Sequence, residues 1–167
     1  KGRFEFPRRK RDIGTIFTAE LACNQDRYEQ LMDYMRTIIV RPGLVLYVNG
    51  ERIDRREPIH TFECQLQTEI GDDLRKSIRT TEVQVFETDG EPAMLYELGI
   101  PVVETGDRWH YSVQQKVPLN IDRDNVTPAF LRSVRVAVLN EMHNRISEDD
   151  TTAMWVEEAS SDPKCTD

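Results

Sequence analysis

Long apolar runs, closely spaced cysteines and a secretion signal are all missing from this 167-residue chain. No run approaches eighteen apolar residues, which excludes a membrane-spanning helix within the sequence. The three cysteines, Cys23, Cys64 and Cys165, are too widely spaced for a disulfide framework or a zinc site. The first residues, Lys1-Gly2-Arg3-Phe4, lack the apolar core of a signal peptide. We therefore expect a cytoplasmic protein in a reducing compartment.

Positive charge is also scarce, because the formal net charge at pH 7 is −8. Phosphate contacts need a surplus of Lys and Arg, so this balance argues against a general nucleic-acid binder. The charge is uneven, however: residues 1–13 carry six basic and two acidic groups, and residues 141–167 carry eight acidic and two basic groups. The run Arg8-Arg9-Lys10-Arg11 leaves two interpretations open, a contact with nucleic-acid or nucleotide phosphate and a solvated arm that meets an acidic partner.

Apolar periodicity predicts two main helices. Asn24 is a plausible N-cap, the apolar residues after it recur at spacings of three and one, and Pro42-Gly43 ends the helix. The second helix starts at Thr127-Pro128, an N-cap followed by proline at the first helical position, and runs for roughly four to five turns. A short third helix is expected through residues 153–156, followed by a tail from Ser160 to Asp167.

Period-two alternation and turn signals predict the strands. Asn49-Gly50 is a strong hairpin signal, Asp89-Gly90 marks a second turn, and Gly99-Ile100-Pro101 is expected to be a break. The expected strands cover residues 14–22, 44–48, 51–55, 62–67, 81–85, 94–98 and 109–119. The predicted class is α+β, with a mostly antiparallel sheet of about six to seven strands and the two main helices packed on one face.

Matching alternation in three segments predicts a single buried sheet face. Its members are Phe62, Cys64, Leu66, Val83, Val85, Trp109, Tyr111, Val113 and Val117. We expect this face to be covered by the helices that hold Leu31/Met35 and Val134/Val138.

The tripeptide Gln114-Gln115-Lys116 lies in the last alternating segment. From Trp109 to Leu119 every second residue, apart from Gln115, is apolar, which places Lys116 on the polar face of the strand. Asn120 and the aspartates after it break the strand, so Lys116 lies near its end, where a side chain can reach a neighbouring molecule or domain.

Three short motifs occur in an order that resembles a known family. Gly14-Thr15-x-Phe17 is similar to the opening of the last strand of a nucleotide-binding domain, Val48-Asn49-Gly50 to the hairpin that follows it, and Gln114-Gln115-Lys116 to a Q-T-K switch loop with Gln115 in place of threonine. Together they resemble the transducer domain of the gyrase/MutL/chaperone/histidine-kinase (GHKL) ATPase superfamily, over roughly residues 14–145. The resemblance implies a ribosomal-protein-type sheet. It also implies that Lys116 is a switch lysine that contacts the terminal phosphate of ATP held in another domain, and that Gln114 braces its loop.

The resemblance also implies what this chain leaves to other parts of a longer polypeptide. The family's magnesium-binding Asn helix, its Asp-x-Gly-x-Gly adenine motif and its glycine-rich lid do not occur in the sequence. ATP and magnesium are therefore expected only with an upstream nucleotide-binding domain, and the chain alone is expected to be non-catalytic. We expect residues 1–23 to be a basic arm and the last strand of that upstream domain, residues 24–146 the transducer-like domain, and residues 147–167 an acidic helix and tail. Homodimerisation of the full-length protein and its biological process, DNA topology and repair among others, stay open.

From the residues alone, two other functions stay open: an interaction or nucleic-acid-handling module, and a soluble scaffold domain. The histidines His60, His110 and His143 lie on different elements without metal-ligand spacing. A basic patch from Arg55-Arg56 with Arg75, Lys76 and Arg79 is less favoured than charge that protects a sheet edge. The acidic run at residues 148–150 fits a cation ligand and a helix start equally well. If Lys116 serves a phosphate in another domain, we expect it to be exposed and without a buried carboxylate partner.

Overall fold

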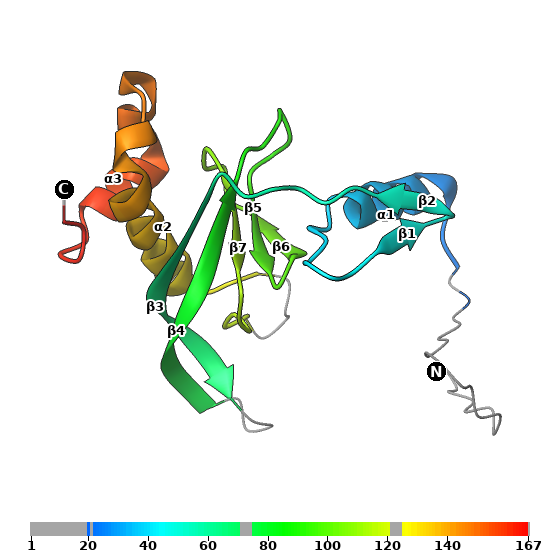
Figure 1. Ribbon diagram of the computed structural model, residues 1–167, viewed down its shortest axis with the longest axis horizontal. Helices are drawn as coiled ribbons and strands as arrows, with labels where there is room; N and C mark the ends of the chain where they lie inside the picture. Colours follow the sequence, from blue (N-terminus) through cyan, green and yellow to red (C-terminus); the bar gives the residue numbers. More distant parts are fainter. Residues whose placement is uncertain (1–19, 21, 71–74, 121–124, 167) are drawn as a thin grey trace.

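The computed structural model describes residues 20, 22–70, 75–120 and 125–166 (Figure 1). Within these residues the chain forms a five-stranded sheet, a two-stranded hairpin and three α-helices, so the predicted α+β class is confirmed. The elements are α1 (Gln25–Arg36), β1 (Leu46–Val48), β2 (Glu51–Ile53), β3 (His60–Ile70), β4 (Arg75–Phe86), β5 (Met94–Glu97), β6 (Ile100–Glu104), β7 (His110–Val113), α2 (Pro128–Met142), the 3-10 turns η1 (His143–Arg145) and η2 (Glu148–Thr152), and α3 (Met154–Ser160).

The larger sheet has the strand order β3-β4-β7-β5-β6. β5 runs parallel to β7, and the other neighbouring pairs are antiparallel, as expected for a mostly antiparallel sheet. β3 and β4 are its longest strands, and they pair over their full shared length from His60↔Val85 to Ile70↔Arg75. β3 and β6 form the two edges.

One face of this sheet carries the main core, and its predicted membership is confirmed. Eight of the nine predicted side chains are buried there, and the ninth, Cys64, is partly buried against them. α2 covers this face with Phe130, Val134 and Val138, and α3 adds Trp155, whose ring meets Trp109 edge to face at 6.1 Å. The register of the three alternating segments is therefore as the sequence predicted.

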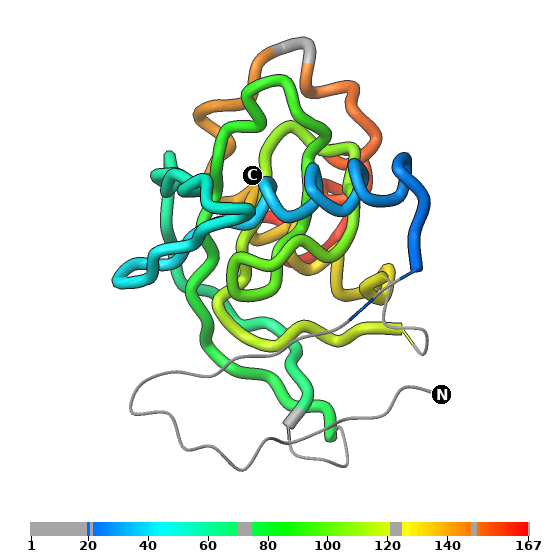
Figure 2. The backbone as a smooth tube through the Cα atoms, turned by 90° about the vertical axis from the view of Figure 1, so that its right-hand side faces the viewer, coloured from blue at the N-terminus to red at the C-terminus, as the bar shows by residue number. Residues whose placement is uncertain are grey.

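The helices do not share one face, which corrects the predicted arrangement. α2 and α3 lie on one side of the sheet, and α1 lies on the other side with the β1–β2 hairpin (Figures 1 and 2). No residue of α1 is fully buried, because the helix packs beside the hairpin: Asn49 Nδ2 donates to the hydroxyl of Tyr28 at 2.9 Å. A second, small core of Ile39, Phe86 and Tyr96 lies between this unit and the sheet. Leu31 and Met35 therefore do not cover the main core.

β7 is more buried than the sequence predicted, because the second small core covers its other face. The strand was expected to be half-buried, with polar residues facing water, yet all four of its residues are buried. His110 and Ser112 have no exposed surface, because the segment around Ile39 covers their side of the sheet. Both faces of β7 are thus enclosed.

Several predicted boundaries were wrong. The first helix was expected to continue to Pro42-Gly43, but α1 ends at Arg36, and Ile39 lies beyond it in the second core. Residues 100–104 form the edge strand β6 and not a break; Pro101 is tolerated there because an edge strand and a register shift near Tyr96 leave its missing N–H without consequence. The strand predicted over 109–119 ends at Val113, and only Leu119 makes a further bridge, with Val126. The helices begin after Asn24 and Thr127 as predicted, and both residues cap their helix through the side chain.

The predictions for the two ends of the chain can be compared with the structure only in part. The predicted strand over 14–22 and the basic run lie, apart from Glu20 and Ala22, outside the described residues. The predicted short C-terminal helix is α3, and the residues after it are held against α2, since Asn140 bonds the carbonyl of Lys164 and the amide of Thr166. No helix in the described part of the chain is long and apolar enough to cross a membrane.

Candidate functional site

The Gln114–Lys116 segment leaves the sheet at the end of β7. The amide of Gln114 donates to the carbonyl of Glu82 at 2.9 Å, which continues the ladder between β7 and β4 by one bond. Farther on, the amide of Val117 donates to the Glu97 carboxylate at 2.8 Å, and Pro118 has no N–H to donate. The chain therefore continues as an irregular segment whose backbone bonds go to side chains.

Side chains of β3 and of the segment itself fix the backbone around Lys116. The buried hydroxyl of Thr68 donates to the carbonyl of Lys116 at 2.7 Å. The amide group of Gln115 donates to the carbonyls of Leu66 and Gln67, both at 3.3 Å. The predicted switch residue is thus tied to β3 through its own carbonyl and, one residue earlier, through the side chain of Gln115.

The side chain of Lys116 remains accessible, with 39% of its surface exposed. Its Nζ lies 4.0 Å from Oε2 of Glu69, whose side chain is only 14% exposed. The expectation that Lys116 has no buried carboxylate neighbour was therefore wrong. A separation of 4.0 Å is too long for a hydrogen bond, so the ammonium is attracted by Glu69 without being locked to it.

The side chain of Gln114 contacts polar groups of β4 and β7. Its Nε2 donates to Oγ of Ser112 at 2.8 Å, and to the Ser112 carbonyl and Oε1 of Gln84 at 3.3 Å. Gln84 in turn donates to Glu82 at 2.7 Å. Gln114 is therefore a well-fixed side chain, and the residues it fixes belong to β4 and β7.

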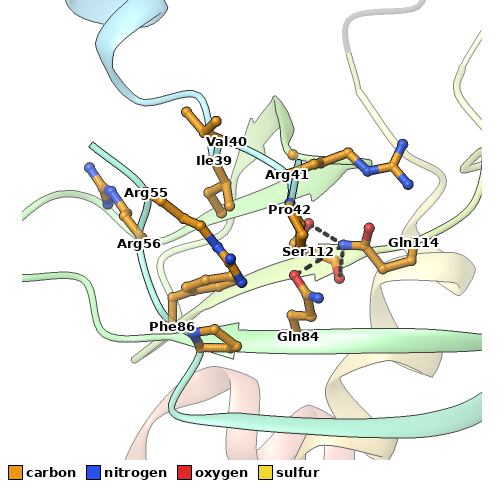
Figure 3. A pocket seen from close by; sticks show the side chains of 12 residues that line it. Ile39, Val40, Arg41, Pro42, Arg55, Arg56, Gln84, Phe86, Ser112 and Gln114 are labelled. Carbon is orange, nitrogen blue, oxygen red and sulfur yellow. Dashed lines mark hydrogen bonds between the residues drawn. The ribbon is translucent and has the colours of Figure 1, made fainter. Parts of the chain in front are cut away.

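Gln114 also lines a small pocket, which we call the junction pocket because it lies where two connections meet the sheet: residues 39–42 between α1 and β1, and residues 55–58 between β2 and β3 (Figure 3). Its enclosed part has room for about one water molecule. Its lining consists of Ile39, Val40, Arg41, Pro42, Arg55, Arg56, Pro58, Gln84, Phe86, Gly99, Ser112 and Gln114. Three of these residues are arginines and none is acidic, although the protein carries a net charge of −8. Lys116 is not among them.

Two backbone contacts hold the pocket walls. The amide of Ile39 donates to the carbonyl of Gly99 at 2.9 Å, and the amide of Ile59 donates to the carbonyl of Val85 at 2.8 Å. Gly99 has φ +88°, and a Cβ there would lie 2.3 Å from the carbonyl oxygen of Ile39. The contact between the first segment and the β5–β6 turn thus requires glycine at this position.

The three arginines differ in how far their charge is already paired. Arg56 is bound, because its Nη2 lies 2.7 Å and 3.0 Å from the two carboxylate oxygens of Glu91. Arg55 pairs with Glu57, which is exposed, at 3.5 Å. Arg41 is exposed and has no ion pair among the residues that the structure describes. Two guanidinium groups at this pocket are therefore available to an anion.

His110 lies beside Arg56, buried within the sheet. Its Nδ1 accepts the amide proton of Met94 at 3.0 Å, which places the proton of a neutral ring on Nε2, 3.7 Å from Glu91. Burial lowers the pKa of His110 below its ordinary value, and the nearby charge of Arg56 lowers it further, although Glu91 and Asp89 oppose this. His110 is thus a neutral structural histidine at neutral pH.

The other residues singled out in the sequence do not form a common site. His60 pairs with Glu141 at 3.3 Å, and His143 contacts the carbonyl of Asn140. Asp150 accepts from Ser147 in a capping box and pairs with Arg108. Among the described residues no group of three potential ligands could hold a metal ion.

Sequence reasoning identified Gln114 and Lys116 but missed the junction pocket. Its arginines lie in two connecting segments that are far apart in the sequence from β4 and β7, so no local pattern links them. The separate grouping of Arg55-Arg56 with Arg75, Lys76 and Arg79 was the nearest signal, and it joined Arg55 to the wrong neighbours: the pocket lining includes Arg41 and none of those three.

Comparisons with protein-family models, with curated proteins and with solved structures found no match for this chain.

Proposed function

We propose that this chain is a non-catalytic transducer module of a GHKL-type ATPase, which supplies Lys116 to an ATP site in an upstream nucleotide-binding domain. The observation that carries the proposal is the geometry around Lys116. Its backbone is anchored to β3 through Thr68, while its ammonium is accessible and not locked in a hydrogen bond. A fixed backbone with a free cationic end suits a residue that meets a ligand from outside the domain.

The neighbouring carboxylate gives the proposal a second support. Glu69 attracts the ammonium at 4.0 Å. A terminal phosphate carries more negative charge than one carboxylate, so it would draw Lys116 away from Glu69. Movement of the lysine between the two anions would make the segment sensitive to whether the nucleotide still has its terminal phosphate.

Steady-state ATP hydrolysis by the complete polypeptide tests this function. We expect Lys116→Ala to lower turnover by roughly 10²–10³-fold, as for loss of one group that stabilises transition-state charge. Nucleotide affinity should change less, since the lysine acts mainly in the transition state. Lys116→Arg should restore little activity, because a planar guanidinium does not reproduce a compact ammonium.

Lys164→Ala is the matched control, since Lys164 is an exposed lysine whose contact with Asn140 of α2 uses the backbone carbonyl and not the side chain. Its turnover should equal that of the unmodified protein. Unchanged hydrolysis in Lys116→Ala would refute the role of this lysine and favour an interaction module.

A further inference from the structure

We propose that the junction pocket is a binding site for the phosphate group of a small molecule, held by Arg41, Arg55 and Ser112. The site is independent of the proposed ATPase role, because Lys116 does not line it.

The first argument is the charge of the pocket. In a protein with a net charge of −8, twelve residues that include three arginines and no acidic residue line one small cavity. Arg56 is already neutralised by Glu91, but Arg55 pairs with an exposed partner at 3.5 Å. Arg41 adds a second guanidinium without an ion pair among the described residues. An anion at the mouth would therefore meet two cations whose charge is not compensated within the site.

The second argument is the direction of the donors. In Figure 3 the guanidinium of Arg55 points toward the middle of the pocket, whereas Arg41 starts at the rim and extends outward past Gln114. Ser112 lies in the floor between them, fully buried. Its oxygen already accepts from Gln114, which leaves the hydroxyl hydrogen to donate. Arg55 and Ser112 thus offer donors from two sides, and the exposed side chain of Arg41 can turn over the mouth to offer a third. Donors from three directions suit a tetrahedral oxyanion better than a planar carboxylate.

The third argument is size. The enclosed part holds about one water molecule, so it accommodates one oxygen of a phosphate group and not a nucleoside or a sugar. The rest of the ligand would remain outside, at the mouth between residues 39–42 and 55–58. Such a ligand would join the two connecting segments to the sheet and hold the α1–β1–β2 unit in place.

The experiment is a titration of the ¹⁵N-labelled chain with inorganic phosphate, followed by two-dimensional NMR at constant ionic strength. We expect saturable shifts of the amides of Ile39, Arg56 and Ser112. Arg41→Gln and Arg55→Gln should each weaken binding at least roughly tenfold, the loss expected for one charge-assisted hydrogen bond. Because both side chains lie at the exposed rim, these variants should fold normally.

Arg52→Gln is the matched control. Arg52 is an exposed arginine of β2 outside the pocket, and its substitution removes the same charge. It should leave binding unchanged, as should Lys116→Ala, which separates this site from the proposed ATPase role. Acetate at the same ionic strength tests the chemistry of the ligand. Equal shifts with acetate, or phosphate binding that survives in the Arg41→Gln/Arg55→Gln double variant, would overturn the proposal.

Discussion

At the scale of single residues, Gly99 permits a long-range backbone contact because it has no Cβ. Its carbonyl accepts from Ile39, and its φ of +88° brings the two backbones together. Gly106 also has a positive φ, +70°, but nothing lies within 4 Å of the place where its Cβ would be. A substitution at Gly106 therefore tests backbone strain alone, whereas a substitution at Gly99 adds steric overlap to the same strain.

We expect Gly99→Ala to destabilise the protein more than Gly106→Ala. Both changes impose a left-handed conformation on alanine, which costs roughly 1–2 kcal/mol. Only Gly99→Ala adds overlap with the Ile39 carbonyl, 2.3 Å away, and this backbone atom cannot move aside as a side chain would. Urea denaturation measures the difference. Equal losses in the two variants would mean that the contact between Ile39 and Gly99 contributes nothing to stability.

Cys64 and Cys23 offer a residue-scale prediction of reactivity. Burial raises the pKa of the Cys64 thiol to about 11, and the charge of Glu141 adds to the rise. Cys23 is exposed. Because the thiolate is the reactive form, the raised pKa leaves the Cys64 thiol almost entirely protonated and therefore poorly reactive near neutral pH. Alkylation at about pH 8, followed by peptide mass spectrometry, should modify Cys23 first. Comparable rates would show that the Cys64 thiol is not shielded.

At the scale of elements, adjacent residues of β3 face opposite sides, one toward the main core and the next toward solvent. Leu66 is 2% exposed and belongs to the main core, and Gln65 beside it is exposed. Leu66→Ala should cost roughly 2–5 kcal/mol, the range for a leucine truncated in a packed core. Gln65→Ala should change stability by less than about 0.5 kcal/mol. A large loss in Gln65→Ala would contradict the register of β3 described above.

The same alternation that predicted β3 correctly was misleading after Val113. Val117 continues the apolar phase and is buried in the main core, yet it lies outside any strand. Its amide bonds the carboxylate of Glu97 and not a neighbouring strand. Burial of alternate residues therefore follows from packing, whereas a strand also needs a ladder partner. Pro118 was the available signal that the ladder ends.

At the scale of the whole molecule, the placement of α1 was beyond local reasoning. The periodicity from Tyr28 onward correctly predicted a helix with one apolar side, but a periodicity does not state which surface that side will meet. The helix packs by the nearby β1–β2 hairpin, while the larger sheet receives α2 on its other face. Gln114 and Lys116 were found because they are adjacent in sequence. The junction pocket was not, because five separate segments build it.

His110 lies where these parts meet, so its protonation should affect the stability of the whole fold. Its pKa is lowered by burial and by Arg56, below the ordinary value of 6.5. The unfolded chain then binds a proton at a higher pH than the folded chain does. The stabilisation is fully present above about pH 6.5 and is lost as the pH falls through the lowered folded pKa.

We therefore expect His110→Asn to flatten the dependence of unfolding free energy on pH below about 6.5. Asparagine keeps an acceptor near the Met94 amide, which Nδ1 of His110 now satisfies at 3.0 Å, but it cannot titrate. His143→Asn is the matched control, because it makes the same substitution at an exposed position. Urea denaturation at several pH values gives the slope for each protein. A slope in His110→Asn equal to that of the unmodified chain would show that the burial of His110 is not linked to folding. The ring would then take up its proton at the same pH in the folded and the unfolded chain.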